Sequence, residues 1–231
     1  MTYANVRQAV FLERPNRFIA VCLLDSEQIQ AHVRNTGRCA ELLVRGARVF
    51  LEKSANPNRK TAYSLIAVYK GDMLVNMDSQ APNKIALEAF RNGKLALPPG
   101  AVGVASEKRC GDSRIDLMFV GRDREPVGFC EVKGVTLERN GTAYFPDAPT
   151  QRGVKHIKEL EKAAQRGLFA EVLFVIQLKG CCRMKPNDRT HRAFGDAMRE
   201  AEHVMFAAYD CMVKEDSIAL DREIAIELTE E

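Results

Sequence analysis

Three charged side chains in two neighbouring strand-like stretches have the types and spacing to hold a metal ion together. Asp116 lies in SRIDLMFV (113–120), and Glu131 and Lys133 lie in FCEVK (129–133). Because side chains along a strand alternate between two faces, Glu131 and Lys133 point the same way, about 7 Å apart. If the two stretches pair as an antiparallel hairpin, Asp116 comes to lie beside Glu131. Two carboxylates and an ammonium group would then converge.

This combination suits phosphate chemistry. Paired carboxylates are usual protein ligands of Mg²⁺, which keeps several waters and takes further ligands from a substrate phosphate. A lysine beside such a site can orient or deprotonate the attacking water, or neutralise charge on the scissile phosphate. The three residues alone fit better a half-buried hairpin whose solvated face carries an ion pair. Other parts of the chain must distinguish the two interpretations.

Length and composition set the outer bounds. The chain has 231 residues, of which 46% are hydrophobic, enough for one large domain or two small ones. No apolar run approaches the ~20 residues that span a bilayer, and the first residues open directly into a strand-like pattern without a signal peptide. We therefore expect a cytoplasmic protein with no membrane partner. Seven scattered cysteines without a C-x-x-C pair predict reduced thiols rather than disulfides or zinc.

Charge is distributed unevenly along the chain. The net charge is +3, but residues 215–231 carry seven acidic side chains and one basic one, which leaves the rest of the chain at +9. A moderate basic excess permits a polyanionic partner without proving one.

The first third of the chain reads as short strands separated by turns. The expected strands are 6–12, 17–24, 28–33, 47–53, 62–69 and 73–77. Five or six strands in so short a stretch predict a small closed barrel, and the OB-fold is the commonest such barrel that binds nucleic acid. The pattern changes at 79–83, so we expect a barrel domain over 1–81 and a second domain over 82–231.

The second domain mixes helices with strands. The expected helices cover 84–92, capped by Asn83, then 151–166, capped by Thr150, and 190–202. Strands are expected near 104–108, 115–120, 129–133, 171–178 and 203–209. The order helix, three strands, helix, strand, helix, strand predicts an α/β arrangement around a mixed sheet, α+β for the chain overall.

Two loops of the barrel and one helix start carry groups that suit a phosphate backbone. RPNRF (14–18) and HVRNTGR (32–38) combine guanidinium groups, amides and a glycine. In the helix over 151–166, Lys155 follows one side, and Arg152 and His156 follow another, near the partly positive N-terminus. Ordinary polar turns and a solvated helix face remain the alternatives at this point.

Longer motifs add a resemblance. They are RPNRF (14–18), NTGR (35–38), PNK with LEA (82–89), SRIDLMF (113–119), EVKGVTL (131–137), FPDAPTQRGVKHIKEL (145–160) and the apolar strand 172–178. With these motifs the chain resembles the sugar fermentation stimulation protein A family over nearly its whole length. The resemblance implies an OB-like barrel fused to a PD-(D/E)XK nuclease-like domain, DNA binding, and a link to the regulation of sugar metabolism, notably of maltose.

The nuclease pattern of that family falls on specific residues of this chain. The resemblance implies catalytic roles for Asp116, Glu131 and Lys133, with Glu88 as the helix acid and Glu107 as a second candidate acid. It implies that Asp116, Glu131, Glu88 and the Val132 carbonyl hold Mg²⁺, with Mn²⁺ as the alternative ion.

The two barrel loops and the helix start supply the residues that we expect to contact nucleic acid. They are Arg14, Arg17, His32, Arg34, Asn35, Thr36 and Arg38 of the barrel, and Thr150, Arg152, Lys155 and His156 of the second domain. The resulting hypothesis is a Mg²⁺-dependent phosphodiesterase acting on DNA, with RNA as an alternative substrate. The competing hypothesis is a non-catalytic, sequence-tolerant DNA-binding regulator of sugar metabolism. The sequence leaves the substrate form open, and also whether the chain is a homodimer.

Overall fold

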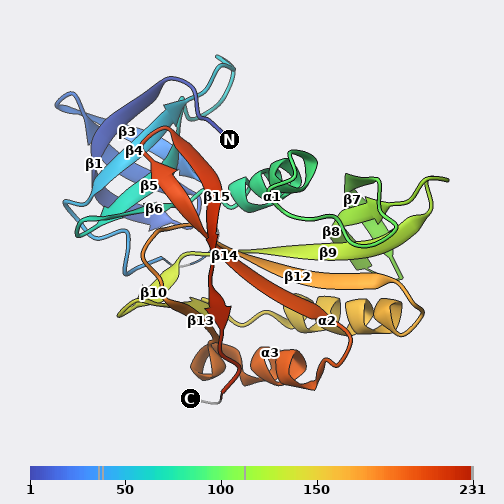
Figure 1. Cartoon of the computed structure of the whole chain (residues 1–231). Helices are drawn as coiled ribbons and strands as arrows, with labels where there is room; N and C mark the ends of the chain where they lie inside the picture. Colours follow the sequence, from blue (N-terminus) through green and yellow to red (C-terminus); the bar gives the residue numbers. More distant parts are fainter. Residues whose placement is uncertain (36, 38, 112, 230–231) are drawn as a thin grey trace.

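The computed structural model describes residues 1–35, 37, 39–111 and 113–229, except for the side chains of Glu107 and Lys108. Along the sequence, a barrel drawn in blue to cyan is followed by a mixed sheet with helices, drawn in green to red (Figure 1). No helix in these ranges is long and apolar enough to cross a membrane. All seven cysteines are free, and only Cys182 is exposed.

The first six strands form the predicted barrel. They are β1 (Val6–Asn16), β2 (Ile19–Leu24), β3 (Glu27–Val33), β4 (Arg48–Lys53), β5 (Tyr63–Lys70) and β6 (Met73–Asn76). Their order is β3-β2-β1-β4-β5-β6, and an additional pairing of β3 with β5 closes the barrel. Alternate positions face the interior, as in β2, where Ala20, Cys22 and Leu24 are buried. The barrel therefore follows directly from the period-two pattern of the sequence.

The second part is built on the predicted mixed sheet. Its strands are β7 (Gly103–Cys110), β8 (Ser113–Val120), β9 (Pro126–Val135), β12 (Phe169–Ile176), β14 (Met205–Lys214) and β15 (Ser217–Glu223). The order is β15-β14-β12-β9-β8-β7, with β12 parallel to both neighbours and the outer pairs antiparallel. Because β12 lies inside the sheet and is covered on both faces, its sequence is almost continuously apolar.

Three helices cover the two faces of this sheet (Figure 1). On one face lies α1 (Ala81–Arg91), whose Phe90 packs edge-on against Phe119 of β8. On the other lie α2 (Gln151–Ala164) and α3 (Asp188–Glu200), and Phe194 of α3 packs against Phe174 of β12. The helices thus bury opposite faces of one sheet.

The acidic C-terminal segment belongs to the fold. A small sheet of β10 (Leu137–Arg139), β11 (Thr142–Phe145), β13 (Arg183–Pro186) and β16 (Ala225–Ile226) includes it. Asp221 pairs with Lys179, and Glu227 pairs with Arg183 at 3.0 Å and Lys185 at 3.1 Å. The segment therefore neutralises a basic loop, and the excess of +9 counted without it overstates the charge available to a partner.

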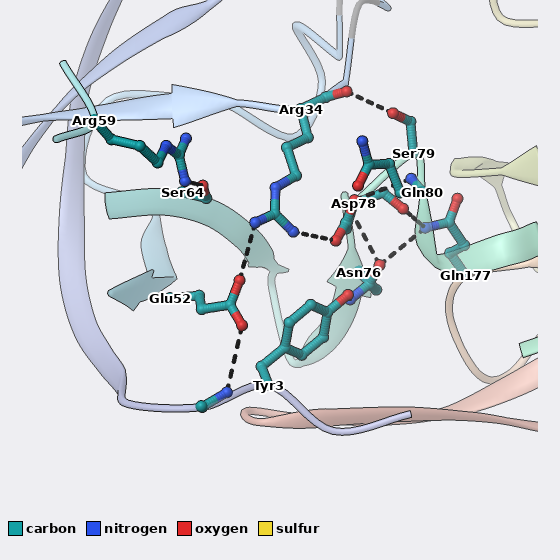
Figure 2. Close-up of polar contacts among 11 residues, drawn as sticks. Tyr3, Arg34, Glu52, Arg59, Ser64, Asn76, Asp78, Ser79, Gln80 and Gln177 are labelled. Carbon is teal, nitrogen blue, oxygen red and sulfur yellow. Dashed lines mark hydrogen bonds and ion pairs between the residues drawn. The ribbon is translucent and has the colours of Figure 1, made fainter. Parts of the chain in front are cut away.

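A buried ion pair joins the barrel to the start of α1 (Figure 2). Arg34, directly after β3, donates to Asp78 at 2.7 Å and to Glu52 at 3.0 Å. Asp78 is completely buried, and its second oxygen accepts the backbone N–H of Gln80 at 2.9 Å. Ser79 also donates to the carbonyl of Arg34 at 2.5 Å. The first turn of α1 is thereby tied to the barrel.

The same network reaches the central sheet. Gln177, which follows β12, donates to Asn76 at 2.9 Å and to the carbonyl of Asp78 at 3.0 Å. The amide of Asn76 donates to the hydroxyl of Tyr3 at 2.9 Å. The N-terminal segment also pairs with the β14–β15 turn, where Thr2 bridges Ser217. Barrel, helix and sheet therefore share one buried polar junction.

Replacing Arg34 by alanine should destabilise the protein strongly. The change leaves the buried carboxylate of Asp78 without its cation, which typically costs about 3–5 kcal/mol. The measurement is the free energy of unfolding from urea denaturation. Arg7→Ala is the control, because its ion pair with Asp25 is exposed and should contribute less than about 1 kcal/mol. Equal losses in the two variants would show that the Arg34 pair is not a structural junction.

A second prediction concerns Glu171 of β12, which lies opposite Cys130 of β9 in the register and is buried. Burial raises the pKa of Glu171 to about 7, and its hydrogen bond with Cys130 offsets only part of that. The folded state then holds a proton that the unfolded chain has already lost. The protonated side chain contributes fully to the free energy of unfolding below the ordinary glutamate pKa. This contribution is lost as the pH rises through about 7.

Glu171→Gln, which imitates the protonated side chain, should remove this pH dependence. The free energy of unfolding of Glu171→Gln should exceed that of the unmodified protein only slightly at pH ~5. The difference should reach about 2–3 kcal/mol at pH ~8. Urea denaturation across that range measures it. A constant difference between the two proteins would show that Glu171 does not retain its proton in the fold.

Candidate functional site

The predicted hairpin is present and brings Asp116 to the second strand. β8 and β9 are antiparallel, with Leu117 opposite Cys130. One Asp116 oxygen accepts the backbone N–H of Val132 at 2.9 Å, and the other accepts the side-chain amide of Asn83 at 2.8 Å. Asp116 is therefore held by β9 on one side and by α1 on the other.

Glu131 is the most unusual group of the site. Its side chain is 4% exposed, and its Oε1 receives both the ammonium of Lys133 and Nδ1 of His156, each at 2.5 Å. Its Oε2 is buried and has no hydrogen-bond partner among the residues that the structure describes. A buried carboxylate oxygen in this condition is costly unless something binds it.

The tautomer of His156 follows from its second contact. Arg152 Nε lies 3.2 Å from His156 Nε2, and a guanidinium can only donate a hydrogen bond. His156 Nε2 is therefore the acceptor, and in the neutral imidazole the ring proton lies on Nδ1, where it is donated to Glu131. The sequence places His156 on a basic surface stripe, but the residue is 3% exposed and faces the sheet.

The two carboxyl groups are shifted in opposite directions. Burial works against the ionised form of Glu131, but the hydrogen bonds from His156 and Lys133 and the charge of Lys133 outweigh it, so its pKa lies below the ordinary value. Burial and the nearby charge of Glu131 raise the pKa of Asp116, although Val132 and Asn83 donate to it. The two carboxyl groups therefore repel one another, and a cation between them would relieve that repulsion.

These residues fit a hard divalent cation. Two oxygen-donating side chains and one buried unpartnered oxygen match Mg²⁺, which binds through one or two carboxylates and keeps several waters. Within the described ranges, no group of three or more His, Cys, Asp or Glu side chains surrounds a common point. The Val132 carbonyl remains a predicted ligand, and the N–H of the same residue is donated to Asp116.

The helix acid expected from the sequence lies elsewhere. Glu88 is 56% exposed and accepts the N-terminal ammonium of Met1 at 3.0 Å. α1 instead contributes Asn83, which was expected to cap the helix. Because the helix begins three residues earlier than the expected start at 84, at Ala81, Asn83 lies in its first turn and faces Asp116. Glu107 belongs to β7, and its side chain is outside the described part of the structure.

The start of α2 has the predicted form. Thr150 caps the helix by accepting the N–H of Gly153 at 3.1 Å. Arg152 and Lys155 are exposed on its first turns, close to the buried His156. The helix thus presents cations to solvent beside the carboxylates, while its inner side positions Glu131.

Most of the described barrel residues expected to contact nucleic acid have internal roles. Arg14 donates to the carbonyls of Arg17 at 2.7 Å, Asn35 at 2.8 Å and Gly37 at 2.9 Å. The Asn35 side chain accepts the N–H of Gly37 at 2.8 Å. Arg34 belongs to the buried junction of Figure 2. These side chains shape the loop after β3 rather than extend from it.

The remaining barrel residues expected to contact nucleic acid differ in their exposure. Arg17 is exposed, with its guanidinium 4.7 Å from the centre of the Phe18 ring. His32 is partly buried, and burial lowers its pKa. Thr36 and Arg38 lie outside the described residues.

The loop after β3 borders the candidate site. A cavity of about 160 Å³ is lined by Asn35 and Gly37 of the barrel and by Gly134 and Asp147 of the second part. Gly134 directly follows Lys133 in β9, so the cavity reaches the strand that carries Glu131 and Lys133.

Comparisons with known proteins agree with this architecture. The family model described as "Sugar fermentation stimulation protein RE domain" matches residues 80–217, and that described as "SfsA N-terminal OB domain" matches 12–77. Homologues named sugar fermentation stimulation protein are 48% identical over 231 residues in Clostridium perfringens strain 13 and 47% identical over 230 residues in Ruminiclostridium cellulolyticum. Each alignment covers 99% of this chain and 100% of the relative.

A solved structure extends the agreement to the fold. The structure of Pyrococcus furiosus SfsA in complex with Ca²⁺ superposes with a TM-score of 0.87 and 26% identity, covering 98% of each chain. Family models and relatives together span both the barrel and the mixed-sheet part. The chain therefore belongs to the sugar fermentation stimulation protein family.

Proposed function

We propose that this protein is a Mg²⁺-dependent phosphodiesterase that acts on DNA, with RNA as an alternative substrate. The observation that carries the proposal is the buried Oε2 of Glu131, which has no partner in the described part of the chain and lies close to the carboxylate of Asp116. The relative from Pyrococcus furiosus is described in complex with Ca²⁺. Ca²⁺ is a hard cation that takes oxygen ligands, as Mg²⁺ does, so this description supports a divalent-metal site here. Mn²⁺ is the expected substitute.

The protein residues of the site have distinct tasks. Asp116 and Glu131 would hold the ion, with the Val132 carbonyl as a further ligand. When bound, the ion would neutralise phosphate charge and lower the pKa of a coordinated water. Lys133 would orient the attacking water and stabilise charge that develops on the phosphate. His156 and Asn83 keep the two carboxylates in place through the hydrogen bonds described above.

The surrounding surface would hold the nucleic acid backbone. Arg152 and Lys155 lie on the exposed side of the α2 start, and Arg17 is exposed on the barrel. Arginine and lysine contacts to phosphates position a strand without reading its sequence. Substrate choice would then depend on strand form rather than on a base motif.

Cleavage of labelled single-stranded, duplex and branched DNA and of RNA, each with Mg²⁺, Mn²⁺ or EDTA, tests the proposal. Metal-dependent cutting of at least one substrate is the expected result, and its pattern identifies the substrate form. Binding that survives EDTA, without cutting under any condition, would instead indicate a non-catalytic DNA-binding regulator.

Glu131→Gln should weaken Ca²⁺ and Mn²⁺ binding by at least about tenfold, because the charged oxygen that lacks a partner is replaced by a neutral amide. Isothermal titration calorimetry measures the affinity. Glu88→Gln is the matched control, since Glu88 is exposed and bonded to the N-terminus, and it should leave the affinity unchanged. A larger loss in Glu88→Gln than in Glu131→Gln would place the metal elsewhere.

Lys133→Ala should slow cleavage by about 10²–10⁴-fold, the usual contribution of a positioned acid–base or water-orienting group. Metal affinity should be retained, because removing an ammonium group beside the site removes a repulsive charge. Rate and affinity are measured on the same preparation, with Lys214→Ala as a surface control. Parallel loss of metal binding would assign Lys133 a purely structural role.

A further inference from the structure

A second cavity opens on the side of Asp116 that faces α1. It has a volume of about 390 Å³ and lies between the first turns of α1 and the strands β7 and β8. Asp116 forms part of its wall, together with Asn83, Lys84 and Leu87 of the helix and Ser106 of β7. We call this cavity the α1–β7 groove. None of the nucleic-acid contacts suggested by the sequence falls in it.

The groove combines three kinds of group that a nucleotide needs. Lys84 is exposed and offers an ammonium group for a phosphate. Leu87 is half-buried and offers apolar surface for the face of a base. Asn83 and Ser106 offer hydrogen-bonding groups for a sugar or a base edge. The volume lies in the range of small-ligand sites, which are mostly apolar with a few placed polar groups.

The position of the groove relates it to the proposed reaction. Asn83 of α1 forms a hydrogen bond with Asp116, whereas His156 of α2 forms one with Glu131. The two carboxylates therefore lie between the groove and the basic start of α2. A strand held by α2 and crossing the carboxylates would place its next nucleotide in the groove.

We propose that the α1–β7 groove binds one unpaired nucleotide adjacent to the scissile phosphate, so that the substrate is single-stranded at this point. The inference rests on the proposed function for the identity of the neighbouring phosphate. The base must be unpaired, because the apolar surface of Leu87 can contact a base face only when that base has left its duplex stack. Lys84 contacts the phosphate of this nucleotide.

Fluorescence anisotropy of a short labelled single-stranded DNA, measured in EDTA over a series of salt concentrations, tests the groove independently of cleavage. Lys84→Ala should weaken binding by about tenfold and reduce the salt slope by about 0.7, the value for one phosphate contact on a single strand. Lys84→Arg should bind as the unmodified protein does. For a blunt duplex probe, Lys84→Ala should weaken binding by less than about twofold, because the bases stay paired.

Lys94→Ala is the matched control. Lys94 follows the same helix, is also exposed and lies outside the groove, 3.9 Å from Asp221. Unchanged DNA affinity in Lys84→Ala would overturn the proposal that the groove binds a nucleotide. Equal losses of affinity in the two alanine variants, or for the two probes, would overturn it as well. Because this readout needs no turnover, a protein that never cuts would refute the phosphodiesterase and leave the anisotropy result to decide the groove.

Discussion

The structure depends on keeping the carboxylate of Glu131 ionised while it is withdrawn from water. An isolated buried charge is too costly to persist, so the fold surrounds one oxygen with the donors of Lys133 and His156. Arg152 in turn fixes the tautomer of His156. The second oxygen is left without a protein partner among the described residues. Glu131 and Asp116 would hold a divalent cation, and its charge would offset the repulsion between the two carboxylates.

The second carboxylate depends on a longer chain of contacts. Asn83 holds Asp116 from the first turn of α1, and that turn is anchored by Asp78. Asp78 is held in place by Arg34 of the barrel and by Gln177 at the end of β12. The barrel therefore does more than extend a binding surface. Its buried junction, shown in Figure 2, determines where α1 starts and hence where Asp116 is held.

Patterns of period two and of helical spacing were sufficient to predict the closed barrel, the mixed sheet and the hairpin that joins Asp116 to Glu131. What they could not predict was the partner of each polar side chain. Glu88 and Asn83 differ only by five positions on one helix, and the true start of that helix decides which faces the site. Arg34 looks like a surface cation in the sequence, but residues distant in sequence bury it. His156 and the acidic C-terminal segment were misplaced for the same reason.

Anomalous diffraction from crystals grown with Mn²⁺ would test the central claim most directly, since it locates the ion without reference to activity. We expect one strong peak at about 2.0–2.6 Å from Glu131 Oε2 and from the Asp116 carboxylate, the range of distances from hard cations to oxygen. The peak should be lost in crystals of Glu131→Gln. A peak elsewhere, or a water in hydrogen-bond contact with Glu131 Oε2 at saturating Mn²⁺, would contradict the central claim.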